Sequence, residues 1–491
     1  MITWGISANS HDAALAVFNN EKLVFASHSE RFSGVKNDPH LHQTMVDYAR
    51  EHWGNPDEVC WYERPVVKSV RQLFAGQGLT FKENNIKKYL RQYGINSPIH
   101  YNSHHRSHAA AGYFTSAFDD ACIIVIDAIG EFNTLSIWKG NKVSLDCVYN
   151  IDYPHSVGLW YSAMTQRIGL KPNEEEYILM GMAAFGDPKR LYNDILNDFI
   201  SFPTNGNLLY IKQNLHKGCQ DWRLELTTEQ DMFDIAAATQ AVYETIFDQT
   251  LQYAQRLVNS KNVVIMGGCA LNCVANSIAY KYYNNVYIMP NPGDAGSAVG
   301  AVLAQHPSWR QLQPFNPFLG YDMGYHTNNE KIVDYLVENK ICGLARGPAE
   351  YGPRALGNRS LIADPRGNDI KDQVNEIKRR QKFRPFAPAI LAEISSEYFD
   401  IPGGSSPYMQ VVARCRNPEL FPAIVHYDGT SRVQTVGKDG SPFRQLLELW
   451  YERTGCPMLL NTSLNIKGEP MVNNQTDAER WSQKYGLPVF N

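Results

Sequence analysis

The chain has 491 residues, a length that favours two or three domains over one. Its hydrophobic content of 44% and aromatic content of 12% suit a well-packed globular enzyme. The net charge of −4 argues against a general affinity for nucleic acid or anionic membranes, although a local basic patch is compatible with it.

The N-terminal residues, the distribution of apolar residues and the cysteines together predict a cytoplasmic protein. The opening residues, "MITWGISANSHD", lack a basic region followed by an apolar one, so we expect no signal peptide. We also find no run of about 18 apolar residues, the length that would predict a membrane span. The nine cysteines include no C-x-x-C pair and predict reduced thiols, not a disulfide framework.

The first thirty residues predict three consecutive strands, "ITWGIS", "AALAVF" and "KLVFASHSE", separated by polar turns. A similar pattern returns at 121–151 with "CIIVIDAIGE", "TLSIWKG" and "KVSLDCVYNI". Two such starts followed by helices predict a duplicated α/β domain, as in actin-like ATPases.

The middle of the chain predicts a long helix at about 234–260, because apolar residues recur there every three or four positions. The buried strand "NVVIMGG" follows, and a later helix begins near Asp294. Three prolines without periodicity predict a linker near 306–325, and a second domain of roughly 170 residues follows it.

His104 and His108 are candidate metal ligands, because a spacing of four places both imidazoles on one helix face. Asp127 and Asp294 are expected at strand or helix ends, where carboxylates are easily offered. Mixed His and Asp ligands suit iron, manganese or zinc. The ordinary alternative is a pair of partly buried histidines, with Asp294 as a helix N-cap.

Two further turns carry candidate residues. Gly267 and Gly268 follow a buried strand and predict a backbone-amide turn that approaches a phosphate closely, although most such turns are only tight turns. His11 is a candidate general base with Asp12 as a neighbouring carboxylate. Adjacent strand residues point to opposite sides, so the spacing alone does not predict that they pair.

The second domain contains three polar stretches. Residues 350–366, "EYGPRALGNRSLIADPR", combine arginines, acids, prolines and glycines without an apolar stripe, which predicts a rigid charged loop and makes it a candidate anion site. "KFRPFAP" places Lys382 and Arg384 two apart, so both would face one anion if the segment is extended. "NTSLN" places Ser463 and Asn465 likewise, although hydroxyl and amide groups are also common turn formers.

These motifs, together with "HDAALAVF", "HHRSHAAAGYF", "GGCALNCVAN" and "NPGDAGSAVGA", occur in an order that resembles the NodU and TobZ-type O-carbamoyltransferases almost end to end. The resemblance implies an actin-like domain at 1–318 and a YrdC-like α/β domain at 319–491. It also implies two steps: carbamoyl phosphate and ATP, with Mg, give carbamoyl-adenylate, and the carbamoyl group then moves to an acceptor hydroxyl.

The resemblance also implies roles for individual residues. His104, His108, Asp127 and Asp294 would hold a divalent metal, with Fe(II) expected and Mn or Zn as alternatives. His11, with Asp12, would deprotonate the acceptor. The expected ligands of nucleotide and carbamoyl phosphate are Arg354, Arg359, Lys382, Arg384, Asn465, Gly267, Gly268, Asn272 and Ser463, the last also counted among the catalytic residues.

The sequence leaves the acceptor open. We expect the hydroxyl of a small molecule such as a sugar, aminoglycoside or macrolide. A second hypothesis is 5-hydroxymethylcytosine in DNA, for which residues 87–94 and 376–384 offer local basic contacts. A third is a nucleotide-binding scaffold without turnover. Monomer and homodimer also remain open.

Overall fold

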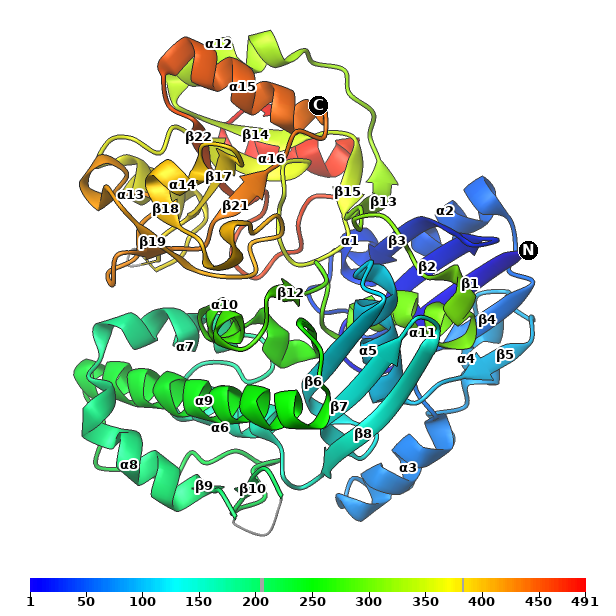
Figure 1. Cartoon of the computed structure of the whole chain (residues 1–491). Helices are drawn as coiled ribbons and strands as arrows, with labels where there is room; N and C mark the ends of the chain where they lie inside the picture. The colour runs from blue at the N-terminus through cyan, green and yellow to red at the C-terminus, as the bar shows by residue number, and fades with distance from the viewer. Residues whose placement is uncertain (204–206, 382–383) are drawn as a thin grey trace. The chain divides into compact units, whose positions relative to one another are not determined.

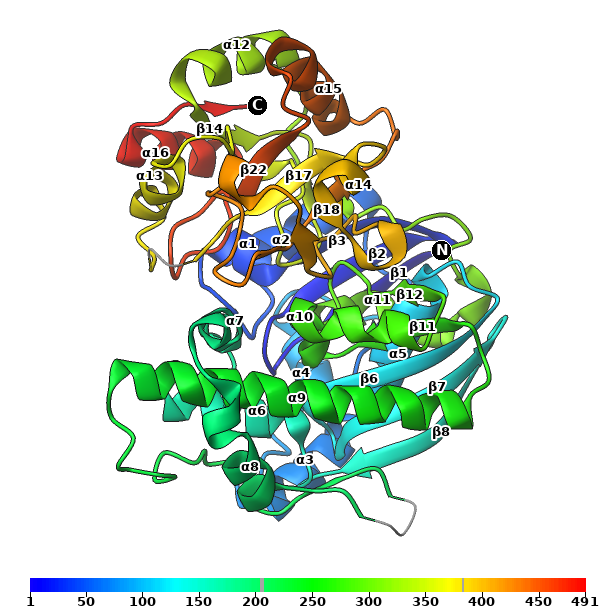
Figure 2. The same cartoon turned by 60° about the vertical axis from the view of Figure 1, so that its left-hand side comes forward.

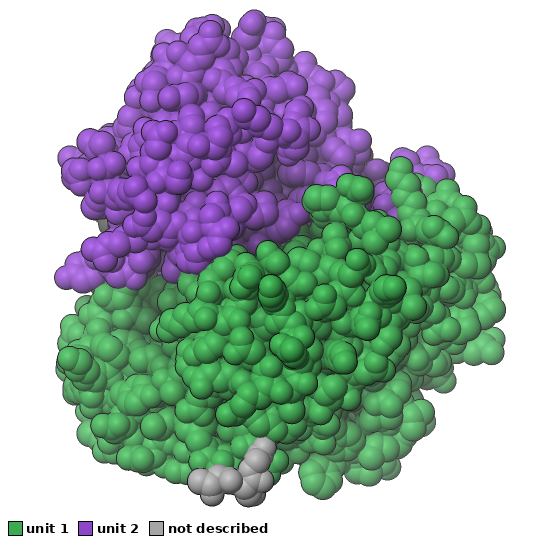
Figure 3. Space-filling model, in the orientation of Figure 1, with its two compact units in different colours: residues 1–9, 18–22, 53–315 green, residues 10–17, 23–52, 316–491 purple. Residues whose placement is uncertain are grey.

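The computed structural model describes residues 1–203, 207–381 and 384–491. The chain forms two compact units, which Figure 3 colours separately. The first unit contains residues 1–9, 18–22 and 53–315, and the second contains residues 10–17, 23–52 and 316–491. Part of the N-terminal sequence therefore groups with the C-terminal residues. The boundary at 318/319 stays a prediction.

The first sheet has the strand order β3-β2-β1-β4-β5. The three predicted opening strands are present, and β1 runs parallel to β4, which runs parallel to β5. The strands are β1 (Ile2–Ser7), β2 (Ala14–Asn19), β3 (Lys22–His28), β4 (Glu58–Trp61) and β5 (Ile99–Tyr101). The helices that follow are α1 (Ser29–Ser33), α2 (Gln43–Trp53), α3 (Pro65–Phe74), α4 (Ile86–Arg91) and α5 (His104–Thr115).

The second large sheet repeats this plan. Its order from one edge is β8-β7-β6-β11-β12, in which an antiparallel β6-β7-β8 meander continues into parallel β11 and β12. The strands are β6 (Asp120–Gly130), β7 (Asn133–Asn141), β8 (Ser144–Asp152), β11 (Asn262–Met266) and β12 (Asn285–Tyr287). The same order in both sheets confirms the predicted α/β fold with a duplicated actin-like first part (Figure 1).

The longest helix, α9 (Glu229–Leu257), confirms the predicted long helix but begins and ends earlier than expected. It begins at Glu229 because Thr228 and Asp231 form a reciprocal capping box. Figures 1 and 2 show α9 beside α6 and α8. In the described part of the chain, no helix has the length and apolar character needed to cross a bilayer.

The remaining elements of the first 315 residues are short. They are α6 (Val157–Arg167), α7 (Glu176–Met182), η1 (Ala183–Phe185), α8 (Pro188–Phe199), β9 (Ile200–Ser201), β10 (Tyr210–Ile211), η2 (Gly268–Leu271), α10 (Cys273–Asn276), η3 (Ser277–Lys281), η4 (Asp294–Gly296), α11 (Ser297–Gln305) and η5 (Pro307–Trp309). Helices α11 and α5 can pack closely because Gly300 has no side chain. A Cβ at this position would collide with the carbonyl oxygen of Ser107.

The C-terminal residues form a mixed six-stranded sheet, in the order β21-β17-β22-β16-β14-β23. Trp450 and the leucines of β22 lie in its apolar core. The elements are α12 (Asn329–Asn339), β14 (Ile341–Ala345), β16 (Arg359–Ala363), α13 (Ile370–Ile377), β17 (Ala387–Leu391), α14 (Ser395–Tyr398), η6 (Pro402–Gly404), η7 (Pro418–Leu420), β21 (Gln434–Val436), α15 (Pro442–Thr454), β22 (Met458–Ser463), α16 (Gln475–Tyr485) and β23 (Val489–Phe490).

The predicted linker at 306–325 is partly ordered into a strand. Within it, β13 (Phe318–Asp322) pairs antiparallel with β15 (Pro348–Glu350), which supplies backbone partners that no sequence pattern indicated. A further small sheet joins β18 (Phe399–Asp400), β19 (Ala413–Cys415) and β20 (Thr430–Ser431). The likeness of this part to YrdC-type enzymes stays a prediction.

Candidate functional site

Helix α5 presents two histidines on one face, as the spacing of four predicts. It begins at His104, and its run of small residues packs against β11 and α11. His104 and His108 are almost fully buried, and their Nε2 atoms lie 3.0 Å apart. Their neighbour His105 turns elsewhere, because its Nδ1 lies 2.7 Å from the Ser136 hydroxyl. Only two of the three histidines therefore meet at this site.

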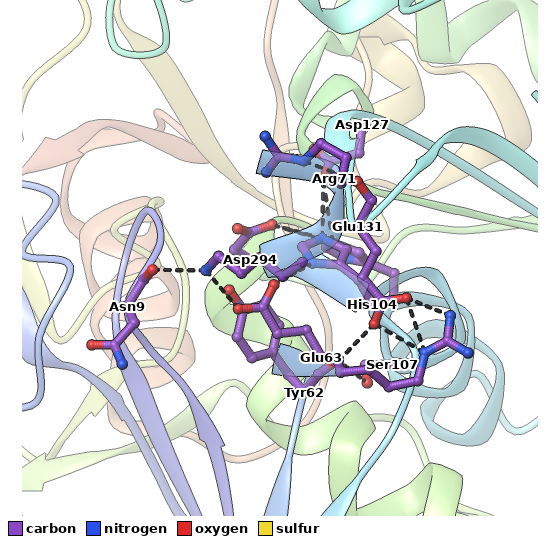
Figure 4. A network of polar contacts seen from close by, with 12 residues as sticks. Asn9, Tyr62, Glu63, Arg71, His104, Ser107, Asp127, Glu131 and Asp294 are labelled. Carbon is purple, nitrogen blue, oxygen red and sulfur yellow. Dashed lines mark hydrogen bonds and ion pairs between the residues drawn. The ribbon is translucent and has the colours of Figure 1, made fainter. Parts of the chain in front are cut away.

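Asp127 and Asp294 meet the histidines from two other elements (Figure 4). Asp127 lies where the β6–β7 pairing is irregular, between Ile126 and Gly130, so its side chain leaves the regular ladder. Its Oδ2 lies 3.1 Å from His104 Nε2 and 3.7 Å from His108 Nε2. Asp294 starts η4 and does not cap α11; its Oδ1 lies 3.3 Å from each Nε2 atom.

The four side chains offer ligand atoms that all lie within 4.8 Å of one another. Two imidazole nitrogens and two carboxylate oxygens form a donor set that suits a divalent transition metal. Burial opposes the charged form of His104, but the Asp294 and Asp127 carboxylates outweigh it and hold its pKa well above the ordinary value. Burial likewise favours the neutral form of Asp127, yet the histidines hold its pKa well below the ordinary value.

An outer layer of charged side chains surrounds this cluster, and the sequence did not single it out. Glu63 Oε2 lies 3.8 Å from His104 Nδ1, and Glu63 Oε1 accepts a 2.6 Å bond from Lys68. Lys68 also donates to the Asn9 carbonyl at 2.8 Å. Carboxylates beside the second ring nitrogen of a ligand histidine orient the ring. Only the fold could reveal this layer, because Glu63 is 41 residues from His104 in the chain.

Glu131, the last residue of the "DAIGE" motif, anchors helix α3 in the same network. Its carboxylate accepts bonds from the Arg64 side chain, with Nε 3.0 Å from Oε2, and its carbonyl accepts from Arg71 Nε at 3.1 Å. Nearby, Gly130 must lack a side chain, because a Cβ there would collide with the His104 ring. The motif therefore contributes both an anchor for α3 and the space that the His104 ring occupies.

The predicted amide turn points at this cluster. The Gly268 N–H donates to Asp127 Oδ1 at 3.2 Å, and Gly267 has a φ of 90°, which favours glycine. Asn272 caps α10 and exchanges hydrogen bonds with Gln240 of α9. Contact of these residues with a nucleotide stays a prediction.

His11 and Asp12 pair directly, which their adjacency alone did not predict. Asp12 has a φ of 52°, and this left-handed turn brings its Oδ2 to 3.2 Å from His11 Nδ1. The His11 side chain is 42% exposed. A carboxylate at this distance can accept the Nδ1 proton of a histidine.

Ser463 ends β22 and Asn465 lies in the turn that follows, and both contact a residue that the sequence did not indicate. Lys378, at the end of α13, is buried, and its Nζ lies 2.5 Å from the Ser463 carbonyl and 3.2 Å from its hydroxyl. The carbonyl and Oδ1 of Asn465 each lie 3.0 Å from the same Nζ. The Ser463 hydroxyl also donates to Asn465 Oδ1 at 2.6 Å.

Burial, assisted by Arg380 and Arg384, lowers the pKa of Lys378 well below its ordinary value. Two positive side chains therefore accompany a buried amine beside the turn, an arrangement that an anion would relieve. Lys378 lies within the run "EIKRRQKFR", which by sequence resembles a solvated charge run. Lys382 lies outside the described residues.

The stretch 350–366, predicted as a loop, contains the buried strand β16 (Arg359–Ala363), because that part pairs with β14 and β22. The loop that precedes β16 is held by internal hydrogen bonds. Glu350 Oε1 accepts from the backbone N–H groups of Leu356, Asn358 and Arg359. The Arg359 guanidinium is buried and, among the described residues, donates to the backbone carbonyl oxygens of Tyr321, Arg346, Gly347, Asn358 and Asn473. Arg354 is half-buried. Arg359 thus braces the loop, and a phosphate contact by it stays a prediction.

The chain is an α/β protein whose duplicated actin-like part carries a cluster of His and Asp side chains. Two family models match this chain, "Carbamoyltransferase N-terminus" over residues 3–303 and "Carbamoyltransferase C-terminus" over residues 333–490. The chain belongs to the carbamoyltransferase family, of the NodU and TobZ type, and is a carbamoyltransferase.

Several known proteins are similar to this chain. An uncharacterized protein of Synechocystis is 33% identical over 97% of this chain and 93% of its own length. Nodulation protein NolNO of Sinorhizobium fredii is 29% identical over 95% of this chain and 76% of its own length. The 3'-hydroxymethylcephem-O-carbamoyltransferase of Amycolatopsis lactamdurans is 26% identical over 97% of this chain and 95% of its own length. Among solved structures, full-length HypF in its phosphate- and nucleotide-bound form is 12% identical, covering 64% of this chain and 47% of HypF, with a TM-score of 0.37.

Proposed function

We propose that this carbamoyltransferase uses ATP and carbamoyl phosphate to form carbamoyl-adenylate and then transfers the carbamoyl group to a hydroxyl of a small molecule. The observation that carries the proposal is the convergence of His104, His108, Asp127 and Asp294 in a chain of this family. We assign transfer to residues 1–318 and adenylate formation, with Mg and ATP, to residues 319–491.

The four-residue cluster fits a divalent metal. Two buried Nε2 atoms 3.0 Å apart and two carboxylates form a compact donor set with little room for other hydrogen-bond partners, and a cation would satisfy all four groups together. When bound there, Fe(II), Mn(II) or Zn(II) would supply Lewis acidity toward a carbonyl oxygen. Glu63 would orient His104, and the Gly268 amide would orient Asp127.

Adenylate formation brings two anions together, so the residues that bind them must offset their repulsion. Lys378 and Arg384 supply positive charge beside Ser463 and Asn465, and we assign carbamoyl phosphate to this turn. Lys378 fixes the Ser463 hydroxyl and the Asn465 amide in one geometry before substrate arrives, which lowers the entropic cost of binding. Arg354 adds a further cation for phosphate.

Transfer requires removal of a proton from an alcohol of high pKa. We assign this to His11, whose Nε2 would accept the hydroxyl proton while Asp12 holds the Nδ1 proton at 3.2 Å. Asp12 would then stabilise the imidazolium that forms. The expected consequence is that His11→Asn keeps adenylate formation but loses transfer.

A small-molecule acceptor is favoured by one relative. The Amycolatopsis protein is named for a 3'-hydroxymethylcephem, which bears a primary hydroxyl on a small molecule. Neither the net charge of −4 nor any relative named above favours hydroxymethylated DNA. Family membership also favours turnover over the scaffold hypothesis.

The test is an assay for AMP and pyrophosphate release that depends on carbamoyl phosphate, followed by mass spectrometry of acceptors. A panel of sugars, cephem alcohols, nucleosides and hydroxymethylated DNA should show a carbamoyl increment on small molecules. An increment on DNA alone would overturn the acceptor class. Absence of AMP release with any acceptor or with water would overturn the two-step reaction.

A further inference from the structure

A second group of side chains with metal-binding chemistry lies at the C-terminal end of α11. Ligand atoms of Glu58, Cys60 and His306 all lie within 4.8 Å of one another. His100 lies beside this group, and its Nε2 is 3.1 Å from Glu58 Oε2. None of these residues takes part in the proposed carbamoyl transfer.

The first sheet and α11 bring these residues together for simple geometric reasons. Glu58 and Cys60 are two apart on β4 and so share one face of the sheet. His100 is the register partner of Cys60 on parallel β5 and lies on that face. The neighbour of Cys60 on β1 is Gly5, where a Cβ would collide with the Ala298 carbonyl of α11, so this face is the one that α11 covers. His306 directly follows α11.

The carboxylate of Glu58 sits between two imidazoles. Its Oε1 lies 2.6 Å from His306 Nε2, and its Oε2 lies 3.1 Å from His100 Nε2. The His100, His306 and Glu58 side chains are 40%, 23% and 15% exposed, so an ion can reach them from solvent. Cys60 is fully buried, and burial, then the Glu58 charge, raises the pKa of its thiol.

We propose that Glu58, Cys60, His100 and His306 form a second, structural site for a zinc-type divalent cation. Imidazole nitrogen, thiolate sulfur and carboxylate oxygen are all donors that Zn(II) takes in proteins, and the sulfur disfavours Mg(II) and Ca(II). Binding displaces the Cys60 thiol proton to solvent and forms the metal–sulfur bond. The ion would tie the end of α11 to β4 and β5 (Figure 1). The other end of α11 follows η4, which begins at Asp294.

Co(II) is the probe that tests the site, because a thiolate bound to Co(II) gives a charge-transfer band in the near ultraviolet. The first cluster has only His and Asp donors, so the band reports Cys60 alone. The full chain, stripped with a chelator and titrated with Co(II), should show the band saturating with one equivalent. Cys60→Ser should abolish it, and His306→Gln should weaken Co(II) binding at this site at least tenfold.

Three control variants separate the two sites. His104→Ala should keep the band, as should Cys147→Ser at an exposed thiol and Cys269→Ser beside the first cluster. The proposal is overturned if the wild-type chain shows no band, or if the band survives Cys60→Ser. Should Cys60→Ser fail to fold, unchanged Co(II) affinity in His306→Gln overturns it, and would mean that Glu58 only accepts hydrogen bonds from the two histidines.

Discussion

The His and Asp cluster and the Ser463 turn solve opposite electrostatic problems. At the cluster, two carboxylates and two imidazoles are pressed together in a buried place, which prepares the site for a cation. At the turn, one buried lysine is surrounded by neutral oxygens and lies near two arginines, an arrangement that we propose binds an anion. We therefore expect mutation to separate the two halves of the proposed reaction.

The largest effect is expected at the cluster. His104→Ala removes one donor and leaves Asp127 and Asp294 facing each other, so metal affinity should fall by at least about 100-fold. Carbamoyl transfer, and the AMP release that accompanies it, should be lost, while the pyrophosphate release of adenylate formation should persist. Metal content and both product assays check this, with the exposed His52→Gln as a control. Equal loss of adenylate formation and transfer would contradict the proposed separation of the two steps.

The next effect is expected at Lys378. Replacement by Met removes the group that fixes Ser463 and Asn465, so kcat/KM for carbamoyl phosphate in adenylate formation should fall about 100-fold. Metal content should not change. Lys371→Met, on the same helix, is the matched control, and Lys382→Met tests the lysine that the sequence indicated. A larger loss in Lys382→Met than in Lys378→Met would reverse our assignment.

Arg359 and Arg354 are expected to have different roles. Arg359 holds backbone carbonyl groups in place, whereas we propose that Arg354 binds phosphate. Arg359→Ala leaves buried carbonyl oxygens without donors, so the free energy of unfolding should fall by about 3 kcal/mol. Arg354→Ala should instead raise KM for ATP or carbamoyl phosphate with little change in Tm. Thermal unfolding and steady-state kinetics of both variants check this. An Arg359 variant of unchanged Tm and raised KM would restore it as a phosphate ligand.

The smallest effect concerns Glu30, a buried anion with a paired cation, in contrast to Lys378. Burial opposes its charge, but Lys36, whose Nζ is 2.8 Å away, outweighs burial together with His28 and Arg31, and these groups lower the pKa of Glu30 from 4.5 to about 2. A lowered carboxyl pKa stabilises the fold above pH 4.5, and this contribution is lost as pH falls toward 2. Glu30→Gln should remove about 2 kcal/mol of that acid-side dependence, measured by denaturant unfolding from pH 7 to 3. An unchanged slope would contradict the pairing.

Local pattern was enough to predict the parts of the fold that depend on periodicity. The two strand triplets, the long helix and the shared face of His104 and His108 follow from alternation and from the helical repeat. The ordered motifs also indicated the family. The strand β13 was missed because its partner lies about thirty residues away, and its own composition reads as a linker.

Motifs and spacing are local properties of the chain, so they indicated which residue types were available for each chemistry. Which of those residues meet depends on how the chain folds. The tertiary structure brought Asp127 and Asp294 to the two histidines, placed Lys378 against Ser463, and turned Arg359 into a brace. Hydrogen bonds and burial between residues distant in the chain decide these partnerships, and no single-sequence pattern encodes those distances.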